Sequence, residues 1–298
     1  TIEASDQCLV MVNGKCSFEL SNIPAGVNVW DSSNLESNML EFFANTFDSI
    51  SKKNLNSNSF IEFDKSLTDP LYIYFLADDK KVESTVFHNF YLLKEGVEIT
   101  IIEKHVSSNR IAKARRRDTV SEWAIGASAK LNYYALEDPF KNSPIETNNK
   151  VIIQQLKNSY CSFFTFYSKD GITNNNLKVL LNEEFATCNL YSISILKDSA
   201  IVNHDIKMSH NSPNCESVQI YKGIFNDSSS GEFNSVVFVK KDAQQTSSVQ
   251  QNNNIILSDY ASVESNPQLE IFADDVQCAH GSTVGQIDYD SLFYLRSR

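Results

Sequence analysis

The chain has 298 residues, of which 42% are hydrophobic and 21% are charged, and its net charge is −11. This composition is that of an ordinary folded chain, long enough for one elongated domain or two compact ones. The acidic balance argues against a nucleic-acid-binding protein, because such proteins usually carry a basic surface. The one basic cluster, Arg115-Arg116-Arg117, is short enough to be a solvated loop. We therefore expect no nucleic-acid partner.

The sequence shows no sign of membrane insertion or secretion. Its longest apolar run, residues 71–77, is far shorter than the ~20 residues of a spanning helix. The N-terminus lacks the basic and apolar segments of a signal peptide. The six cysteines are scattered without a CxxC pair, which is typical of reduced thiols. These features predict a cytoplasmic protein, or one of a plastid or related organelle if the source is eukaryotic, with no membrane partner.

The first 59 residues combine strand and helix signals. Residues 9–12 and 15–18 flank Asn13-Gly14, a pair that supplies the positive φ of a tight hairpin turn. Residues 34–54 carry apolar side chains at helical spacing, preceded by capping residues at 31–33. We expect residues 1–59 to form a small N-terminal α/β cap.

From about Phe60 onward the hydrophobic pattern changes to period two, which is typical of strands with one buried face. A turn residue followed by a small or apolar residue recurs between these segments. The spacing from Ala243 to Ala261 is 18 residues, and from Ala261 to Gly281 it is 20. Strand-rich repeats of about twenty residues predict a parallel β-solenoid. We therefore place a core domain over residues 60–298, with its β-helix ending near Gly285.

Three polar segments are expected between strands. Residues 137–149 are predicted to form an exposed loop, residues 226–230 a turn between coils, and Asn252-Asn253-Asn254 a coil corner. Asparagines stacked at such a corner can bond each other along the solenoid, although a plain polar loop explains the same composition.

Two candidate metal ligands, Cys278 and His280, lie two residues apart near the C-terminus, between Asp274-Asp275 and Gly281. Residues i and i+2 of a strand point to the same side, so both ligand atoms would face one direction. Thiolate and imidazole bind transition metals and iron–sulfur clusters. Two ligands cannot close a tetrahedral site, so a partner chain would have to complete it. The competing interpretation is a cysteine that packs as a small hydrophobe and a histidine hydrogen-bonded to Asp274 or Asp275.

The other candidate residues carry weaker signals. His210 and Cys215 flank the strand-breaking Pro213 and fit a structural coil corner better than a ligand site. Three further histidines are isolated along predicted strands: His88, His105 and His204. No GxSxG, GxxxxGK[ST] or HExxH motif is present. We therefore expect no ATPase activity in this chain.

Residues 8–298 resemble the SufD branch of the SufB/SufD family, the scaffold subunits of the SUF iron–sulfur cluster assembly complex. The resemblance rests on residues 215–224, on residues 242–246 with 250–259, and on residues 267–298. The first two stretches are shared with SufB, whereas the Cys-Ala-His-Gly step and the ending Leu-Phe-Tyr-Leu-Arg-Ser-Arg of the third resemble SufD. The resemblance implies a mainly β fold, a right-handed parallel β-helix. It also implies a non-catalytic scaffold that pairs with a SufB-like subunit through its β-helix and binds a SufC-like ATPase through a C-terminal helical region.

The resemblance assigns roles to the candidate ligands as well. It places the role of nascent-cluster ligand on His280 and makes Cys278 its neighbour at the interface with the SufB-like partner. Asp274 and Asp275 are then carboxylates that would orient the imidazole. We expect no stable cluster on the chain alone, and whether a flavin binds the assembled complex stays open. The family's helical region continues past the position of Arg298, so docking of the ATPase is in doubt if that tail is absent from the protein.

The competing function is that of a β-helical carbohydrate-binding or carbohydrate-active protein, because this fold supports both classes. Such a protein would need acidic and basic side chains clustered along one exposed face of the solenoid. Co-purification separates the two functions, because a scaffold would bring down its partners and a carbohydrate enzyme would purify alone.

Overall fold

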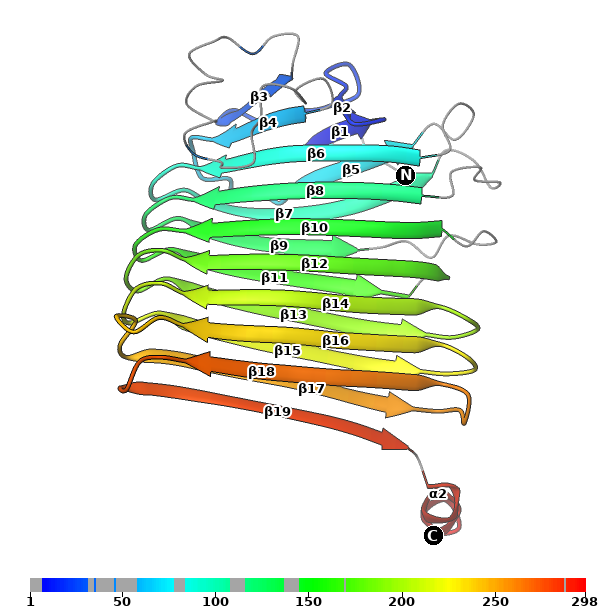
Figure 1. Cartoon of the computed structure of the whole chain (residues 1–298). Helices are drawn as coiled ribbons and strands as arrows, with labels where there is room; N and C mark the ends of the chain where they lie inside the picture. The colour runs from blue at the N-terminus through cyan, green and yellow to red at the C-terminus, as the bar shows by residue number, and fades with distance from the viewer. Residues whose placement is uncertain are drawn as a thin grey trace.

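The computed structural model describes residues 7–31, 35, 46, 58–77, 84–107, 116–136, 145–168, 170–286 and 288–298. Within them, two sheets of mostly parallel strands face each other along a solenoid (Figure 1). Successive strands alternate between the sheets, so each turn of the solenoid adds one strand to each. The predicted parallel β-helix is confirmed.

The strands of each sheet lie side by side in chain order, except that β2 forms the edge beyond β1. The first sheet contains β1 (Cys8–Val12), β2 (Lys15–Cys16), β5 (Leu71–Ala77), β7 (Glu98–Ser107), β9 (Lys130–Leu136), β11 (Tyr160–Tyr167), β13 (Thr187–Leu196), β15 (Glu216–Phe225), β17 (Thr246–Ile256) and β19 (Val276–Gln286). The second contains β3 (Val27–Asp31), β4 (Asn58–Phe63), β6 (Ser84–Leu93), β8 (Arg116–Ile125), β10 (Ile145–Gln155), β12 (Gly171–Leu181), β14 (Ile201–His210), β16 (Ser230–Val239) and β18 (Ser262–Ile271). Helix α2 (Tyr289–Arg296) follows β19. No helix in the described part of the chain has the length and hydrophobicity needed to cross a membrane.

The N-terminal hairpin forms as predicted. Strands β1 and β2 pair antiparallel, and Asn13 and Gly14 have φ of 49° and 88° in the turn. Strand β1 also pairs in parallel with β5, and β3 pairs antiparallel with β4, so the N-terminal strands extend both sheets. The helix predicted over residues 34–54 lies outside the described residues, apart from Leu35 and Thr46.

Alternating burial along the strands builds the interior. In β14, for example, Val202, Ile206 and Met208 are buried, whereas Lys207 between them is exposed. Most of the inward apolar side chains form one core cluster with members from Leu9 to Ala273, and Val202 belongs to a smaller cluster beside it. Period-two hydrophobicity therefore predicted the inward face correctly.

Six successive corners that lead from the second sheet to the first, from the corner before β7 to the corner before β17, share one backbone feature. Each of these six contains a residue with positive φ: Gly96, Ser128, Asn158, Phe185, Asn214 and Gln245. The residue that follows each of these is buried, at or directly before the start of the next strand: Val97, Ala129, Ser159, Ala186, Cys215 and Thr246. The sequence pattern of a turn residue before a small or apolar residue reflects this corner, for example at Gly96-Val97.

The solenoid repeat is close to thirty residues, so the predicted repeat of about twenty is wrong. Hydrogen-bonded asparagines on neighbouring turns lie 26 residues apart for Asn148 and Asn174, 29 for Asn174 and Asn203, and 32 for Asn234 and Asn266. One turn holds two strands and two corners, so spacings of 18 and 20 residues cover only part of it.

Two of the three predicted inter-strand segments need correction. Residues 226–229 form the expected turn between β15 and β16. Asn252-Asn253-Asn254, predicted at a corner, lies inside β17, and residues 145–149 of the predicted loop belong to β10. Residues 137–144 lie outside the described ranges. Asn253 donates to Thr283 Oγ1 on the next turn at 2.9 Å, because in-register parallel strands place side chains of successive turns next to each other.

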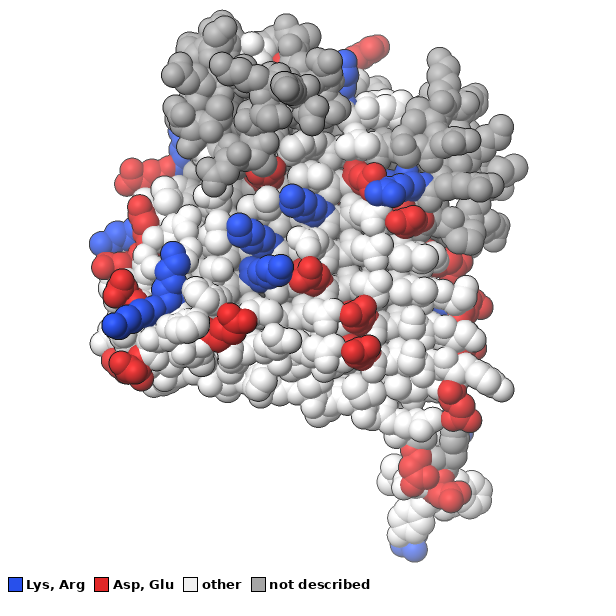
Figure 2. Space-filling view, in the orientation of Figure 1, with Lys and Arg blue, Asp and Glu red and all other residues white. Residues whose placement is uncertain are grey.

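A hydrogen-bonded ladder of this kind runs along the outer face of the second sheet. The Nδ2 atoms of Asn148, Asn174 and Asn203 donate to Asp118 Oδ1, Asn148 Oδ1 and Asn174 Oδ1 respectively, each at 2.9 Å. Figure 2 shows positive and negative side chains interspersed on this face, around the large uncharged area of the sheet. The face therefore carries a polar ladder rather than an extended basic surface.

A glycine on β15 tests the packing of the interior. A Cβ added at Gly223 would collide with the Phe225 ring and lie 2.6 Å from Asn254 Oδ1. We expect Gly223→Ala to lower the free energy of unfolding by about 1–3 kcal/mol in urea titrations, as overpacking does. Gly285→Ala is the control, because an added Cβ there meets no atom within 4 Å. Equal effects of the two substitutions would contradict this account of the interior.

Candidate functional site

Strand β19 is the last strand of the first sheet, and in the described structure it pairs only with β17. The register places Cys278 next to Ser248 and His280 next to Gln250. Ser248 and Gln250 are buried between the sheets. Cys278 and His280 therefore lie on the inward side of the final turn, and one strand presents both in the same direction.

The final turn is the open end of the solenoid in the described structure (Figure 1). Most residues of β18 and β19 are exposed, because no further turn covers them among the described residues. Cys278 is half-buried and packs against the core cluster, whereas His280 is exposed. Burial raises the pKa of the Cys278 thiol, and a backbone hydrogen bond from Ser248 partly offsets this. The thiol is thus protonated at neutral pH, and a bound metal would have to displace its proton.

The two carboxylates predicted to orient the imidazole lie in the turn before β19. The Asp275 backbone N–H donates to Gln244 Oε1 at 2.9 Å, and its carbonyl accepts from the Gln245 N–H at 2.6 Å. Extended backbone from Asp275 to His280 spans ~16 Å. The backbone contacts of Asp275 therefore anchor the Asp274-Asp275 turn against the preceding corner, and the orienting role of the two carboxylates stays a prediction.

The interior beneath the candidate ligands is polar. In the two columns that lead to the candidate ligands, β9 and β11 place apolar or aromatic side chains, such as Leu131 and Phe163. On β15 and β17 the corresponding columns hold two buried serines and two buried glutamines: Ser217, Gln219, Ser248 and Gln250. These two columns thus change from apolar to hydrogen-bonding side chains as they approach the open end.

A buried imidazole belongs to this polar interior. His210 Nε2 and Ser217 Oγ are 2.9 Å apart, and Ser217 Oγ lies 2.8 Å from Ser248 Oγ. Cys215 is buried in the corner before β15 and its Sγ lies 3.2 Å from the Glu183 carbonyl oxygen. The two residues make separate contacts, in agreement with the structural interpretation of this pair.

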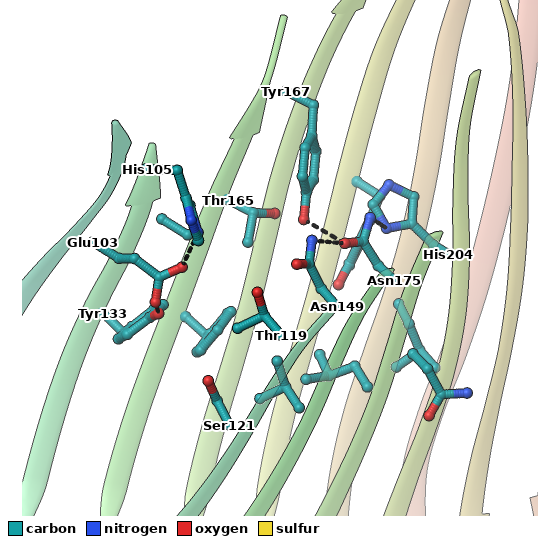
Figure 3. A pocket seen from close by; sticks show the side chains of 17 residues that line it. Glu103, His105, Thr119, Ser121, Tyr133, Asn149, Thr165, Tyr167, Asn175 and His204 are labelled. Atoms are coloured by element: carbon teal, nitrogen blue, oxygen red, sulfur yellow. Dashed lines mark hydrogen bonds and ion pairs between the residues drawn. The ribbon is translucent and has the colours of Figure 1, made fainter. Parts of the chain in front are cut away.

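A second polar region surrounds an internal cavity of about 50 Å³ further along the solenoid (Figure 3). Glu103 Oε2 accepts a hydrogen bond from the Tyr133 hydroxyl, and 2.7 Å separates Glu103 Oε1 from His105 Nε2. On the other side, Asn175 Oδ1 accepts from Tyr167 OH at 2.9 Å, and its Nδ2 lies 3.4 Å from His204 Nδ1. The volume suffices for a few water molecules. Two histidines expected to be isolated thus line one chamber, and Glu103 and His105 carry the i, i+2 spacing that signals a shared face.

A shallow groove of 460 Å³ lies over the outer face of the second sheet. Its carboxylates take part in the polar ladder: Asp118 accepts from Asn148 at 2.9 Å and Asp205 from Asn176 at 3.0 Å. Lys150 also lines the groove. The acidic side chains here stabilise the stacked asparagines.

No three His, Cys, Asp or Glu side chains of the described ranges gather in a way that would hold a metal ion. Cys278 and His280 therefore form an incomplete ligand set on this chain, as two ligands leave a tetrahedral centre open.

The two buried histidines of β14, His204 and His210, predict a pH dependence of stability. Burial lowers the pKa of His204 to about 3 and that of His210 to about 4, below the ~6.5 of an unfolded chain. The unfolded state binds more protons between these values, so stability is complete above pH ~6.5 and falls as the pH drops. Each group contributes a slope of about 1.4 kcal/mol per pH unit.

Urea unfolding at pH 7.5, 5.5 and 4.5 measures this slope. His210→Gln removes one titrating group and keeps a side chain able to hydrogen-bond to Ser217, so it should flatten the curve below pH 6. An unchanged slope in this variant would show that His210 does not titrate on unfolding.

Comparison with known proteins identifies the region that contains this site. Residues 75–298 match the family model described as "SUF system FeS cluster assembly, SufBD core domain". The matched region runs from β5 to the C-terminus and includes Cys278 and His280.

Several curated relatives carry names from the same system. The chain is 30% identical over 222 residues to the iron–sulfur cluster assembly protein SufD of Escherichia coli, which covers 74% of the chain and 51% of that protein. It is 26% identical over 319 residues to an iron–sulfur cluster assembly SufBD family protein of Synechocystis, and this match covers 99% of the chain and 70% of that protein. It is 26% identical over 240 residues to the chloroplastic protein ABCI7 of Arabidopsis thaliana, and this match covers 77% of the chain and 49% of that protein. The chain thus spans about half the length of the Escherichia coli and Arabidopsis thaliana proteins.

Proposed function

Because this chain belongs to the SufBD core family of the SUF iron–sulfur cluster assembly system, we propose that it is a SufD-like, non-catalytic scaffold subunit. In this proposal it pairs with a SufB-like subunit through the open end of its solenoid, and a nascent iron–sulfur cluster assembles at their interface with His280 as a ligand. The observation that carries the proposal is the exposed final turn, which presents an imidazole and a thiol together.

The open end suits pairing with another sheet. Strands β18 and β19 are 10 and 11 residues long, and each is the terminal strand of its sheet in the described structure. A long terminal strand offers a row of backbone donors and acceptors that a partner strand can satisfy. A partner solenoid added here would cover Cys278 and His280 and bring its own ligands beside them.

In this proposal the chain must supply a ligand to a nascent iron–sulfur cluster that the SufB-like subunit also binds. A neutral imidazole is a good borderline ligand for iron, and a thiolate is a soft one. His280 is exposed and can bind directly, whereas Cys278 is half-buried and must first lose a proton from a thiol whose pKa is raised. This difference supports His280 as the principal ligand and Cys278 as its neighbour.

The proposed contact with a SufC-like ATPase is placed in the region that begins with α2. This short helix exposes three large side chains: Phe293, Tyr294 and Leu295. Their exposure supports a docking role for the helical region, in which a partner would cover them.

The partner interface has a direct test, because Cys278 is the one cysteine of the six that is not buried. A thiol-specific heterobifunctional crosslinker should therefore react at Cys278 alone. In the assembled complex we expect crosslinks to the SufB-like subunit, with Cys278→Ser as the control that abolishes them. Crosslinks that reach only the ATPase, or no partner at all, would contradict this interface.

The alternative carbohydrate function has less support. The groove on the second sheet holds Asp118 and Asp205 in hydrogen bonds to asparagines, and the family match concerns cluster assembly. Co-purification decides between the two functions: the scaffold should bring down a SufB-like chain and an ATPase, and recovery of the full protein alone would favour the alternative.

A further inference from the structure

Three successive turns present the same pair of positions to the interior. Ser217-Val218-Gln219 on β15 and Ser248-Val249-Gln250 on β17 are in register, and Cys278-Ala279-His280 on β19 is the next member. Two columns result, one of Ser217, Ser248 and Cys278, and one of Gln219, Gln250 and His280. The two candidate ligands thus replace a repeated serine and glutamine at the last turn.

Gln250, the residue directly beneath His280, has an unused acceptor. Its side chain is fully buried, and its Nε2 donates to the Ser235 carbonyl at 3.4 Å. Its Oε1 has no hydrogen-bond partner among the described residues. Ser235 Oγ donates to Gln219 Oε1 at 2.8 Å, so the same serine holds both amides of the column. A buried acceptor without a partner is rare and calls for an explanation.

We propose that Gln250 is a positioning residue for His280: its Oε1 accepts the N–H of one imidazole nitrogen and leaves the other nitrogen free to bind the cluster. Side chains on the same side of adjacent parallel strands start ~4.8 Å apart, within reach of a glutamine and a histidine. Metal-binding histidines commonly donate their second N–H to an oxygen, which fixes the tautomer and the ring orientation. In the structure Gln250 Oε1 and the ring are not hydrogen-bonded, so the contact requires the exposed His280 side chain to turn toward Gln250. The positioning role of this contact rests on the proposed function.

The contact can be tested on the protein without cluster by ¹⁵N NMR of labelled histidine at pH 8, where the neutral tautomers are distinguished. The chain has five histidines, and His280→Ala assigns the signal of interest. Wild type should show one dominant tautomer at His280. Gln250→Met, which removes the amide at similar volume, should shift the ring toward a mixture of tautomers, and Gln250→Glu should retain the single tautomer because a carboxylate also accepts.

Gln219→Met is the matched control, because it removes a buried amide from the same column one turn further from His280. It should leave the His280 signals unchanged. If Gln250→Met fails to fold, Gln250→Asn takes its place, since it keeps a buried amide whose oxygen is one methylene too short. Unchanged tautomers in a folded Gln250 variant, or an equal shift in Gln219→Met, would overturn the proposal. A shift in Asp274→Ala instead would assign the orienting role to that carboxylate.

Cluster assembly in the reconstituted complex gives the second readout. Gln250→Met should lower cluster yield about 10-fold, the usual loss when a residue that orients a ligand is removed, and Gln250→Glu should recover most of it. A tautomer shift with wild-type yield would overturn the positioning role. If His280→Ala itself leaves the yield unchanged, the proposed function fails, and the NMR result still decides whether the contact exists.

Discussion

Replacing His280 with alanine should lower the yield of iron–sulfur cluster in the assembled complex by at least ~10-fold, since it removes a ligand rather than a residue that orients one. The side chain is exposed on the terminal strand, so its loss should change the free energy of unfolding by no more than ~0.5 kcal/mol. Iron and sulfide bound per complex after anaerobic reconstitution measure the effect.

The matched control is Gln277→Ala. Gln277 is also exposed on β19 but lies on the opposite side of the strand from the two ligands. It should retain wild-type yield and wild-type association with the SufB-like subunit. A normal yield from His280→Ala, in a complex shown by gel filtration to be assembled, would leave the chain with a purely architectural role.

The second large effect concerns the chain in isolation, which should take up no stable cluster. The described residues offer Cys278 and His280 at the open end and no gathering of three potential ligands. Anaerobic reconstitution should therefore give little iron- and sulfide-dependent visible absorbance. Addition of the SufB-like subunit should produce the absorbance, because it supplies the missing ligands.

A double variant, Cys278→Ser with His280→Ala, sets the background for nonspecific iron binding. The wild-type chain alone should not exceed this background. A stoichiometric cluster that persists on the isolated wild-type chain after desalting would show that the site is not shared between subunits.

Local patterns in the sequence predicted the local structure well. The Asn13-Gly14 pair specified the hairpin, and alternation of apolar and polar residues specified the inward faces of the strands. The spacing of Cys278 and His280 placed both on one side of a strand. These features depend on neighbouring residues only, which is why they can be read without knowledge of the turns above and below.

Features that depend on register between turns were missed. The repeat was underestimated because the corners from the first sheet to the second and those from the second to the first look alike in sequence. A residue meets its stacked neighbour only one full turn later, after two such corners. The same error put Asn252-Asn253-Asn254 at a corner instead of inside β17. With the thirty-residue repeat known, the succession Ser-Val-Gln, Ser-Val-Gln, Cys-Ala-His would have pointed to Gln250 as the residue beneath His280.

Pulsed electron paramagnetic resonance of the reduced cluster tests the central claim most directly. The complex would be assembled from this chain labelled with ¹⁵N at histidine and an unlabelled SufB-like subunit. Ligation by His280 predicts a ¹⁵N hyperfine coupling strong enough for a directly bound nitrogen, which disappears in His280→Ala. A cluster that forms in full yield and shows no coupling to histidine nitrogen of this chain would contradict the assignment.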